Sequence, residues 1–337
     1  MSTVADFTER ELIARITTRL PPPPGWMAVG IGDDAAVVEP ERNRLEVLSV
    51  DALVEGVHFD RAFTPPAAIG HRALAVNLSD LAAMGAEPRL CLLSLALPAS
   101  LPIADFDGIA VGITTLAARH RLHVAGGNLT RSPGPLVIDV TVVGTVKRRQ
   151  VLRRSGARPG DELYVSGSLG AAAAGLGMLK ANGLAACTGE NPCAPCAARY
   201  LYPEPRLRLG ILVARTEAAH AGMDLSDGLA DGVHQLAEAS GVGAIVDADA
   251  LPVEPAARAW FDQHGEDAVS AALTGGDDYE LLLAVHPKAG RRLAEARRHG
   301  GGVALTRIGI CTEDPAVLLK RRDTEAEPLP KGFHHFR

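Results

Sequence analysis

The hydrophobic pattern of the first half of the chain alternates between helical and extended spacing. Residues 7–16 are apolar at helical spacing, and Thr8 with Glu11 forms a candidate capping box. Residues 65–88 predict a long helix with Pro66 in its first turn, and Gly85 favours its end. A further helix is expected at 105–122, and extended patterns occupy residues 43–59, 89–98, 122–130 (a short strand that runs into a glycine turn) and 134–148.

The pattern restarts after a turn rich in glycine, proline and arginine that follows residue 148. We therefore expect two domains, over residues 1–148 and 149–337. In the second half we expect helices at 168–183, 205–215, 224–241 and 287–300, an irregular loop at 182–197, and strands within 153–167, 243–252, 277–285 and 303–310. Helices and strands mix without a regular βαβ rhythm, so each half is predicted to be α+β.

The composition indicates a globular protein and argues against nucleic-acid-binding and membrane-spanning proteins. The 337 residues are 47% hydrophobic, which is enough for a sizeable core, and carry a formal net charge of −6, which argues against a nucleic-acid-binding surface. Apolar runs such as residues 90–98 are far shorter than the ~20 residues that a membrane helix needs. The N-terminus lacks a long apolar segment, so we expect a cytoplasmic protein without a membrane partner.

The five cysteines do not suggest a disulfide framework, because their number is odd and the chain is long. Cys193 and Cys196 form a CxxC pair, for which a zinc or redox site is conceivable. No second CxxC exists and no histidine lies at zinc-finger spacing, so an irregular loop is the favoured interpretation.

Acidic residues recur at strand ends, glycine turns and helix starts. Those singled out by position are Asp33, Asp34, Asp51, Asp80, Asp224, Asp227, Asp277 and Asp278. For Asp227 a simple helix N-cap is an equally good interpretation, as it is for Ser226. Asp80 differs, because its neighbours at helical spacing are small or apolar, and a carboxylate facing such a surface needs a partner.

Many aspartates without a His/Cys cluster favour Mg²⁺ over zinc, and Mg²⁺ in turn suggests a phosphorylated substrate. Two glycine-containing segments, residues 125–130 and 165–170, are candidate phosphate cradles. No P-loop motif is present, so a nucleotide would have to be bound in another way. Arg153 and Arg154 either meet a phosphate or form a solvated basic turn.

A set of motifs in fixed order resembles the thiamine-monophosphate kinase family, which belongs to the aminoimidazole ribonucleotide synthetase-like superfamily. The matching stretches are "GIGDDAAVV", "SVDALVEGVHF", "ALAVNLSDLAAMGA", "VAGGNLT", "RRSGARPGD", "MDLSDGLADGVHQLA", "TGGDDYELL" and "KGFHHF". The resemblance implies ATP-dependent phosphorylation of thiamine monophosphate to thiamine diphosphate, by direct in-line transfer without a catalytic base. It also implies two α+β domains: an N-terminal domain that binds ATP and Mg²⁺ and pairs into a homodimer through a β-rich interface, and a C-terminal domain that completes the active-site cleft.

The resemblance also assigns roles to individual positions. Those that match metal ligands of the family are Asp34, Ser49, Val50 (through its backbone), Asp51, Asp80, Asn128, Asp224 and Asp227. Those that match nucleotide contacts are Gly127, Asn128, Arg154 and Ser226, and those that match substrate contacts are His58, Asp277 and Phe333. The chain departs from the family at Asn128 (often Asp), Asp277 (commonly Glu) and Ala110 (Tyr in some members).

Two other functions stay open from the sequence. One is another enzyme of the superfamily that uses the same aspartates on a different phosphate acceptor. The other is a regulator that binds a metal or nucleotide without turnover, to which Asn128 and Asp277 lend support as departures from the family pattern.

Overall fold

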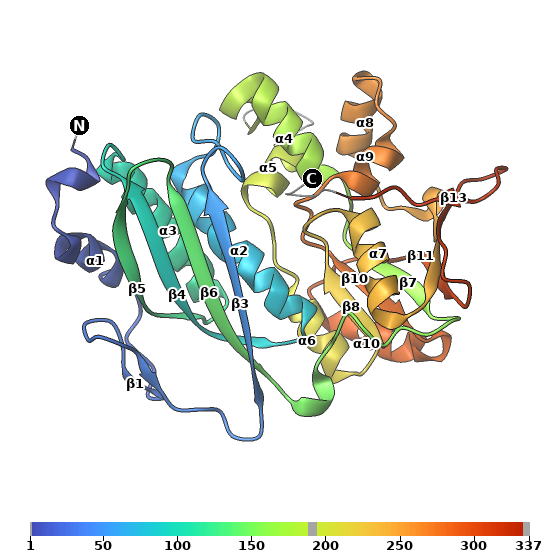
Figure 1. The fold of residues 1–337 in the computed structure, drawn as a ribbon, viewed down its shortest axis with the longest axis horizontal. Coiled ribbons are helices and arrows are strands. Elements are labelled where there is room, and N and C mark those ends of the chain that lie inside the picture. The colour runs from blue at the N-terminus through green and yellow to red at the C-terminus, as the bar shows by residue number, and fades with distance from the viewer. Residues whose placement is uncertain (1, 188–193, 333–337) are drawn as a thin grey trace. The chain divides into compact units, whose positions relative to one another are not determined.

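The computed structural model describes residues 2–187 and 194–332, which fall into two compact units (Figure 1). The first comprises the residues up to Leu81 and Glu87–Arg148, and the second comprises Ala82–Ala86 and the residues from Arg149 onward. Both units mix helices with largely antiparallel sheets, so the α+β prediction is confirmed.

The first unit is built on a four-stranded sheet of order β3-β6-β4-β5, in which only β4 and β5 are parallel. Helices α2 and α3 lie along one face of this sheet (Figure 1). The elements in chain order are α1 (Glu9–Thr17), β1 (Met27–Val29), β2 (Val37–Val38), β3 (Leu45–Val54), α2 (Pro66–Ala83), β4 (Glu87–Pro98), α3 (Ile103–Arg119), β5 (His123–Ser132) and β6 (Val137–Val146).

Strand alternation divides this sheet into a buried face and an outer face. Ile138, Val140 and Val142 of β6 are fully buried beneath the helices. On the outer face Leu48 and Val50 of β3 are 66% and 56% exposed, and Leu92 of β4 is 40% exposed. A row of exposed aliphatic side chains thus covers one side of the sheet.

The second unit is built on a seven-stranded sheet of order β13-β12-β9-β11-β7-β10-β8, in which only β12 and β9 are parallel. Its elements are β7 (Glu162–Ser166), α4 (Ala171–Asn182), α5 (Ala194–Leu201), α6 (Leu207–Arg215), β8 (Ala221–Asp224), α7 (Leu229–Ser240), β9 (Gly243–Asp247), α8 (Pro255–Gln263), α9 (Ala268–Thr274), β10 (Leu281–Val285), α10 (Gly290–His299), β11 (Leu305–Thr312), β12 (Val317–Lys320) and β13 (Glu327–Pro328). All five residues of β10 are buried, as are all four of the neighbouring edge strand β8.

Local signals in the sequence located several boundaries correctly. Thr8 caps α1, and its side chain and that of Glu11 form the predicted reciprocal capping box. Helix α2 begins at Pro66, and the chain turns away at Gly85, whose φ is +66°.

Other expectations were wrong. The strand predicted at 122–130 does not run into a glycine turn, because β5 continues through both glycines to Ser132. The loop predicted at 182–197 contains the start of α5 at Ala194, and α8 and α9 were not predicted. Among the described helices, none combines the length and apolarity needed to cross a bilayer.

Candidate functional site

In the first unit, helix α2 brings Asp80 to strand β3. The Ser49 hydroxyl donates a hydrogen bond to Asp80 Oδ2. The Asp80 carboxylate, which was expected to need a partner on its apolar helix face, is thus bound by a serine from the sheet. One turn earlier the fully buried Asn77 accepts a hydrogen bond from the Asp51 backbone N–H at 3.0 Å and donates to the Ala73 carbonyl at 3.0 Å. Asn77 therefore fastens the helix to the strand beside Asp51, and sequence reasoning assigned it no role.

Asp51 and Ser49 share the helix-facing side of the sheet, whereas Val50 lies between them on the outer side. Asp51 pairs with Val140 and Ser49 with Val142, both buried beneath the helices. Asp51 itself is exposed, so its carboxylate lies at an accessible edge of that face. β3 is an edge strand, which leaves the Val50 backbone on the border of the sheet.

Asp34 and His58 lie in two separate turns of the first unit. Asp34 is exposed in the loop between β1 and β2, and its backbone N–H donates to Asp33 Oδ1 at 2.9 Å, so Asp33 serves as the turn residue. His58 follows β3, and its Nδ1 accepts a hydrogen bond from the Val54 backbone N–H at 3.0 Å. The neutral imidazole of His58 therefore carries its proton on Nε2.

Gly127 and Asn128 lie within β5, on opposite faces of the sheet. Gly127 is paired with Leu93, and a Cβ at position 127 would lie 2.0 Å from the Leu93 carbonyl oxygen, so this close approach requires glycine. Asn128 is paired with Ser94 and is exposed on the outer face. Because these glycines are extended, the phosphate cradle predicted at 125–130 is not formed by a turn.

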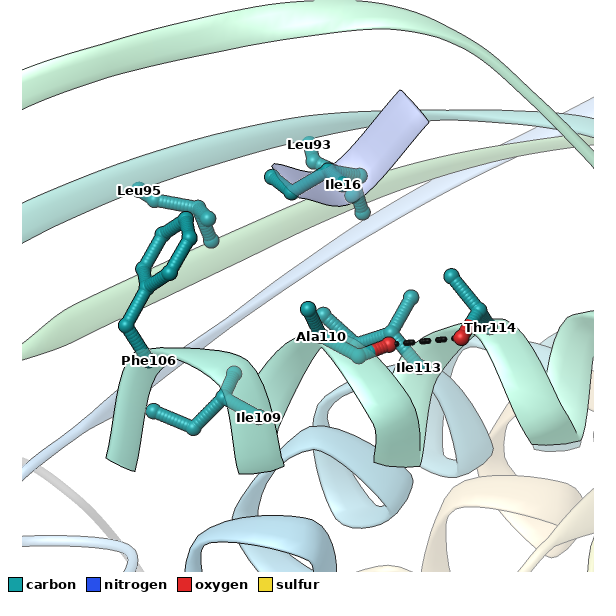
Figure 2. Close-up of a pocket in the computed structure, with 8 residues that line it drawn as sticks. All are labelled: Ile16, Leu93, Leu95, Phe106, Ile109, Ala110, Ile113 and Thr114. Atoms are coloured by element: carbon teal, nitrogen blue, oxygen red, sulfur yellow. Dashed lines mark hydrogen bonds between the residues drawn. The ribbon is translucent and has the colours of Figure 1, made fainter. Parts of the chain in front are cut away.

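Ala110 is part of the interior of the first unit. It lines a small apolar cavity of about 10 Å³ between α1, α3 and β4, together with Ile16, Phe106 and Thr114 (Figure 2). A cavity of this size barely holds one water molecule, and its lining is apolar. Ala110 therefore faces the core of the first unit.

In the second unit, two loops that are distant in sequence run side by side. The Asp277 N–H donates to the Ser226 carbonyl at 2.7 Å, and the Tyr279 N–H donates to the Leu225 carbonyl at 2.9 Å. Ser226 Oγ donates to Asp227 Oδ2 at 3.1 Å. The structure thus gathers Ser226, Asp227 and Asp277 at the end of β8, whose last residue is the buried Asp224.

The N-cap interpretation of Ser226 and Asp227 was wrong. Helix α7 starts at Leu229, and its N-cap is Gly228 with a φ of +96°. A Cβ there would lie 2.8 Å from the Leu273 carbonyl oxygen, so both conformation and space demand glycine. The hydroxyl and carboxylate that precede the helix are consequently not used as its cap.

Arg154 lies against helix α7. Its Nη1 donates to Gln235 Oε1 at 2.6 Å, and Gln235 in turn donates to Asp231. The C-terminal segment reaches the same helix, because a Cβ on Gly332 would lie 2.4 Å from that of Asp231. Phe333, the predicted substrate contact that follows, lies outside the described residues.

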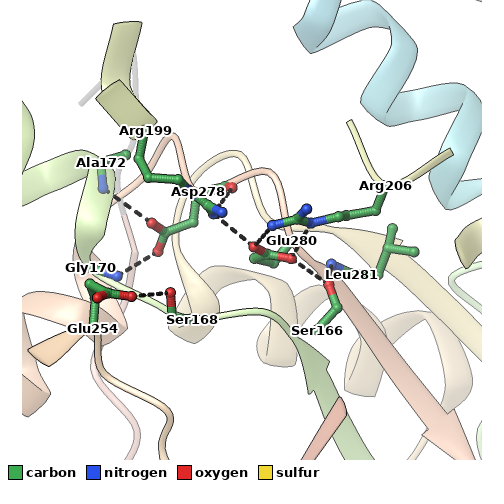
Figure 3. A network of polar contacts seen from close by, with 10 residues as sticks. All are labelled: Ser166, Ser168, Gly170, Ala172, Arg199, Arg206, Glu254, Asp278, Glu280 and Leu281. Atoms are coloured by element: carbon green, nitrogen blue, oxygen red, sulfur yellow. Dashed lines mark hydrogen bonds and ion pairs between the residues drawn. The ribbon is translucent and has the colours of Figure 1, made fainter. Parts of the chain in front are cut away.

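A buried charge network lies behind the two loops (Figure 3). Glu280, with no exposed surface, accepts hydrogen bonds from Arg206 Nε at 2.7 Å, from Arg199 at 2.7 Å and from Ser166 at 2.6 Å. Asp278 accepts from the Gly170 and Ala172 backbone N–H groups at 2.8 and 3.3 Å. The phosphate cradle predicted at 165–170 is therefore wrong, because an internal carboxylate occupies the amides at the start of α4.

Burial dominates the electrostatics of Asp278. Removal from water raises the pKa of its carboxyl to about 7, although the Gly170 amide and Arg199 act in the opposite direction. Neither Asp278 nor Glu280 was singled out for this role. Their only signal in the sequence is the cluster of acidic residues after two glycines, which does not reveal which side chains turn inward.

The predicted metal ligands fit Mg²⁺ in kind but do not form a complete cage. No group of three His, Cys, Asp or Glu side chains within residues 2–187 and 194–332 is arranged to hold a metal. The donors near Asp80 and Asp51 are carboxylate and hydroxyl oxygens, the ligands of a hard cation. Mg²⁺ commonly takes only one or two carboxylates and completes its shell with phosphate oxygens and water.

The CxxC pair offers no described metal site. Cys196 is fully buried on α5, and Cys193 lies outside the described residues.

Comparison with known proteins finds relatives of both halves of the chain. Residues 32–146 match the family model for the AIR synthase related protein N-terminal domain, and residues 158–320 match that for the C-terminal domain. A thiamine-monophosphate kinase of Synechococcus elongatus is 42% identical over 312 residues, which cover 90% of this chain and 91% of that protein. The chain belongs to the thiamine-monophosphate kinase family.

Solved structures agree with this membership. A thiamine-monophosphate kinase from Stenotrophomonas maltophilia superposes with a TM-score of 0.83 at 38% identity, covering 95% of this chain and 98% of that one. A structure of AaThiL complexed with AMPPCP and TMP superposes with a TM-score of 0.74 at 31% identity, covering 97% and 98%. The fold implied by the family resemblance is therefore confirmed along nearly the full length.

Proposed function

We propose that this member of the thiamine-monophosphate kinase family transfers the γ-phosphate of ATP to thiamine monophosphate, giving thiamine diphosphate and ADP. The observation that carries the proposal is the full-length likeness to AaThiL, which was solved with the ATP analogue AMPPCP and with TMP. The acceptor phosphate is already ionised at neutral pH, so the chain needs no general base, and the reaction requires mainly alignment and charge neutralisation.

We assign Mg²⁺ to oxygen donors in both units. In the first unit these are Asp34, Ser49, the Val50 backbone, Asp51, Asp80 and Asn128; in the second they are Asp224 and Asp227. When bound, Mg²⁺ neutralises the phosphate charge that develops during transfer. Two contacts support this assignment: the Ser49 hydroxyl holds the Asp80 carboxylate, and Asn77 holds the backbone of Asp51 on the same side of the sheet.

The nucleotide and the substrate are assigned to separate groups of residues. Gly127, Asn128, Arg154 and Ser226 contact ATP, and His58, Asp277 and Phe333 contact thiamine monophosphate. Arg154 is hydrogen-bonded to Gln235, which places a cation on the unit that carries Ser226.

We also propose that the chain acts as a homodimer through its N-terminal domain. β3 and β5 are opposite edges of the four-stranded sheet, so Asp51 and Asn128 are three strand spacings, roughly 14 Å, apart. They also lie on opposite faces, and one copy therefore does not bring both to the same ion. A second copy placed on the exposed Leu48, Val50 and Leu92 would bury that apolar face.

We place the reaction in the cytoplasm, where ATP is available and thiols stay reduced. Cys91 and Cys311 are buried free cysteines, as expected in a reducing compartment.

A coupled assay of ADP release tests the proposal. With Mg²⁺, ADP release should depend on added thiamine monophosphate. Release only with a different phosphate acceptor would indicate another enzyme of the superfamily, and ATP binding without ADP release would indicate a regulator.

A further inference from the structure

Two non-glycine residues of the segment 277–280, Asp277 and Tyr279, have left-handed backbone conformations. Their φ angles are 67° and 50°. L-residues avoid this region because Cβ crowds the backbone; aspartate enters it more readily than most residues. Such conformations persist where surrounding contacts enforce them, and they concentrate at functional sites. The contacts that hold Asp277 and Tyr279 in these conformations therefore indicate what the segment does.

The segment is anchored by its alternate residues. Asp278 and Glu280 turn inward, where the α4 amides bind the first and two arginines bind the second (Figure 3). Backbone hydrogen bonds from the Asp277 and Tyr279 N–H groups tie the other side to the 225–226 loop. The backbone between these anchors is consequently fixed on both sides.

Tyr279 links this rigid backbone to the Asp277 carboxylate. Its hydroxyl donates to Asp277 Oδ1 at 3.0 Å, and the tyrosine residue is only 8% exposed. A buried ring cannot follow a moving partner, so the hydrogen bond restricts rotation of the half-buried carboxylate about its Cβ–Cγ bond. A carboxylate offers about four lone-pair positions, so accepting from Tyr279 does not exhaust its capacity.

We propose that Tyr279 is a positioning residue that orients the Asp277 carboxylate toward the thiamine moiety of the substrate. The inference rests on the proposed function. Thiamine presents an amino group and a cationic ring, and a negatively charged acceptor held in one orientation suits both. The Tyr279 hydrogen bond also suits an aspartate at position 277, where the family pattern has glutamate. Aspartate has fewer rotatable bonds than glutamate, so one tyrosine suffices to fix its carboxylate.

The variant Tyr279→Phe removes the hydroxyl and keeps the ring. The matched control is Tyr164→Phe, because Tyr164 likewise donates to a carboxylate two residues away, Glu162, at 3.0 Å. We expect Tyr279→Phe to raise KM for thiamine monophosphate by about fivefold to twentyfold, while kcat and KM for ATP stay within about twofold. The control should change none of these constants.

A double-mutant cycle separates positioning from a general structural effect. In an Asp277→Ala background, Tyr279→Phe should raise KM for thiamine monophosphate by no more than about 1.5-fold, because the carboxylate it orients is gone. An unchanged KM in the single variant, or equal losses with and without Asp277, would overturn the proposal. A lower thermal midpoint with unchanged KM would indicate a structural role and would overturn it too.

A crystal structure of Tyr279→Phe makes the test independent of turnover. We expect the Asp277 carboxylate to rotate or to occupy several orientations, and an unchanged single orientation would refute the positioning role. If the wild-type chain forms no thiamine diphosphate, the proposed function fails, and this structure still decides whether Tyr279 orients Asp277.

Discussion

Ser49 on strand β3 donates its hydroxyl hydrogen bond to the carboxylate of Asp80 on helix α2. The contact joins two segments 31 residues apart and gives a carboxylate on a mainly apolar helix face the partner it needs. It also leaves Asp80 half-buried, a position from which it can serve a cation and still be held by the protein.

We expect activity to depend on the negative charge of Asp80 more than on the shape of its side chain. Asp80→Asn keeps an oxygen to accept from Ser49 but removes the negative charge, so we expect kcat to fall roughly 100- to 1,000-fold without loss of folding. Steady-state kinetics at saturating Mg²⁺ and a thermal melt check this. Asp107→Asn is the control, because Asp107 pairs with Arg15 in the same unit and should affect stability only. Wild-type turnover in Asp80→Asn would refute the metal role.

Mixed dimers should reveal whether each site draws on two copies. Asp51→Asn and Asn128→Ala should each lower activity when expressed alone. In a mixed dimer one site receives both defects and the other receives Asp51 and Asn128 intact. A one-to-one mixture should therefore recover about a quarter of wild-type activity, since half of its dimers are mixed. No recovery above the two separate variants would show that the two residues act within one copy.

Asp278 should make stability depend on pH. Because its pKa is raised to about 7, the folded state binds this proton more tightly than the unfolded chain does. Its contribution is complete below the unfolded pKa near 4 and is lost as the pH rises toward 7, by about 1.4 kcal/mol per pH unit at most. Asp278→Asn should flatten this slope.

Urea unfolding midpoints at pH 5, 6 and 7 measure the effect. Asp267→Asn is the control, because hydrogen bonds from Ser270 and the Arg321 cation outweigh its burial and lower the pKa of Asp267 to about 2, outside this range. Its midpoints should run parallel to those of the wild type. Equal slopes in wild type and Asp278→Asn would show that Asp278 does not titrate in this window.

Features that depend on neighbouring residues could be predicted from the sequence. Contacts between residues distant in the sequence could not. The capping box of Thr8 and the end of α2 near Gly85 depend on neighbouring residues, and both were predicted. The need of Asp80 for a partner was also predicted, but its identity as Ser49 depends on how the helix lies on the sheet.

The wrong expectations have the same physical origin. The glycines before Asn128 indicated a turn, but glycine is needed at position 127 because the β4 backbone passes close by. The glycine-containing segment 165–170 indicated an anion site, and the anion bound by its Gly170 amide proved to be Asp278, 108 residues further along the chain. In each case the sequence pattern indicated that a glycine or a bound anion was needed, but it did not identify the neighbouring group responsible.

The most direct test follows the phosphoryl group itself. The purified chain is incubated with γ-labelled ATP, Mg²⁺ and thiamine monophosphate, and the products are separated by chromatography. We predict that the label moves to thiamine diphosphate in a one-to-one ratio with ADP formed. Label found only in inorganic phosphate, or retained in ATP, would contradict the proposed phosphoryl transfer.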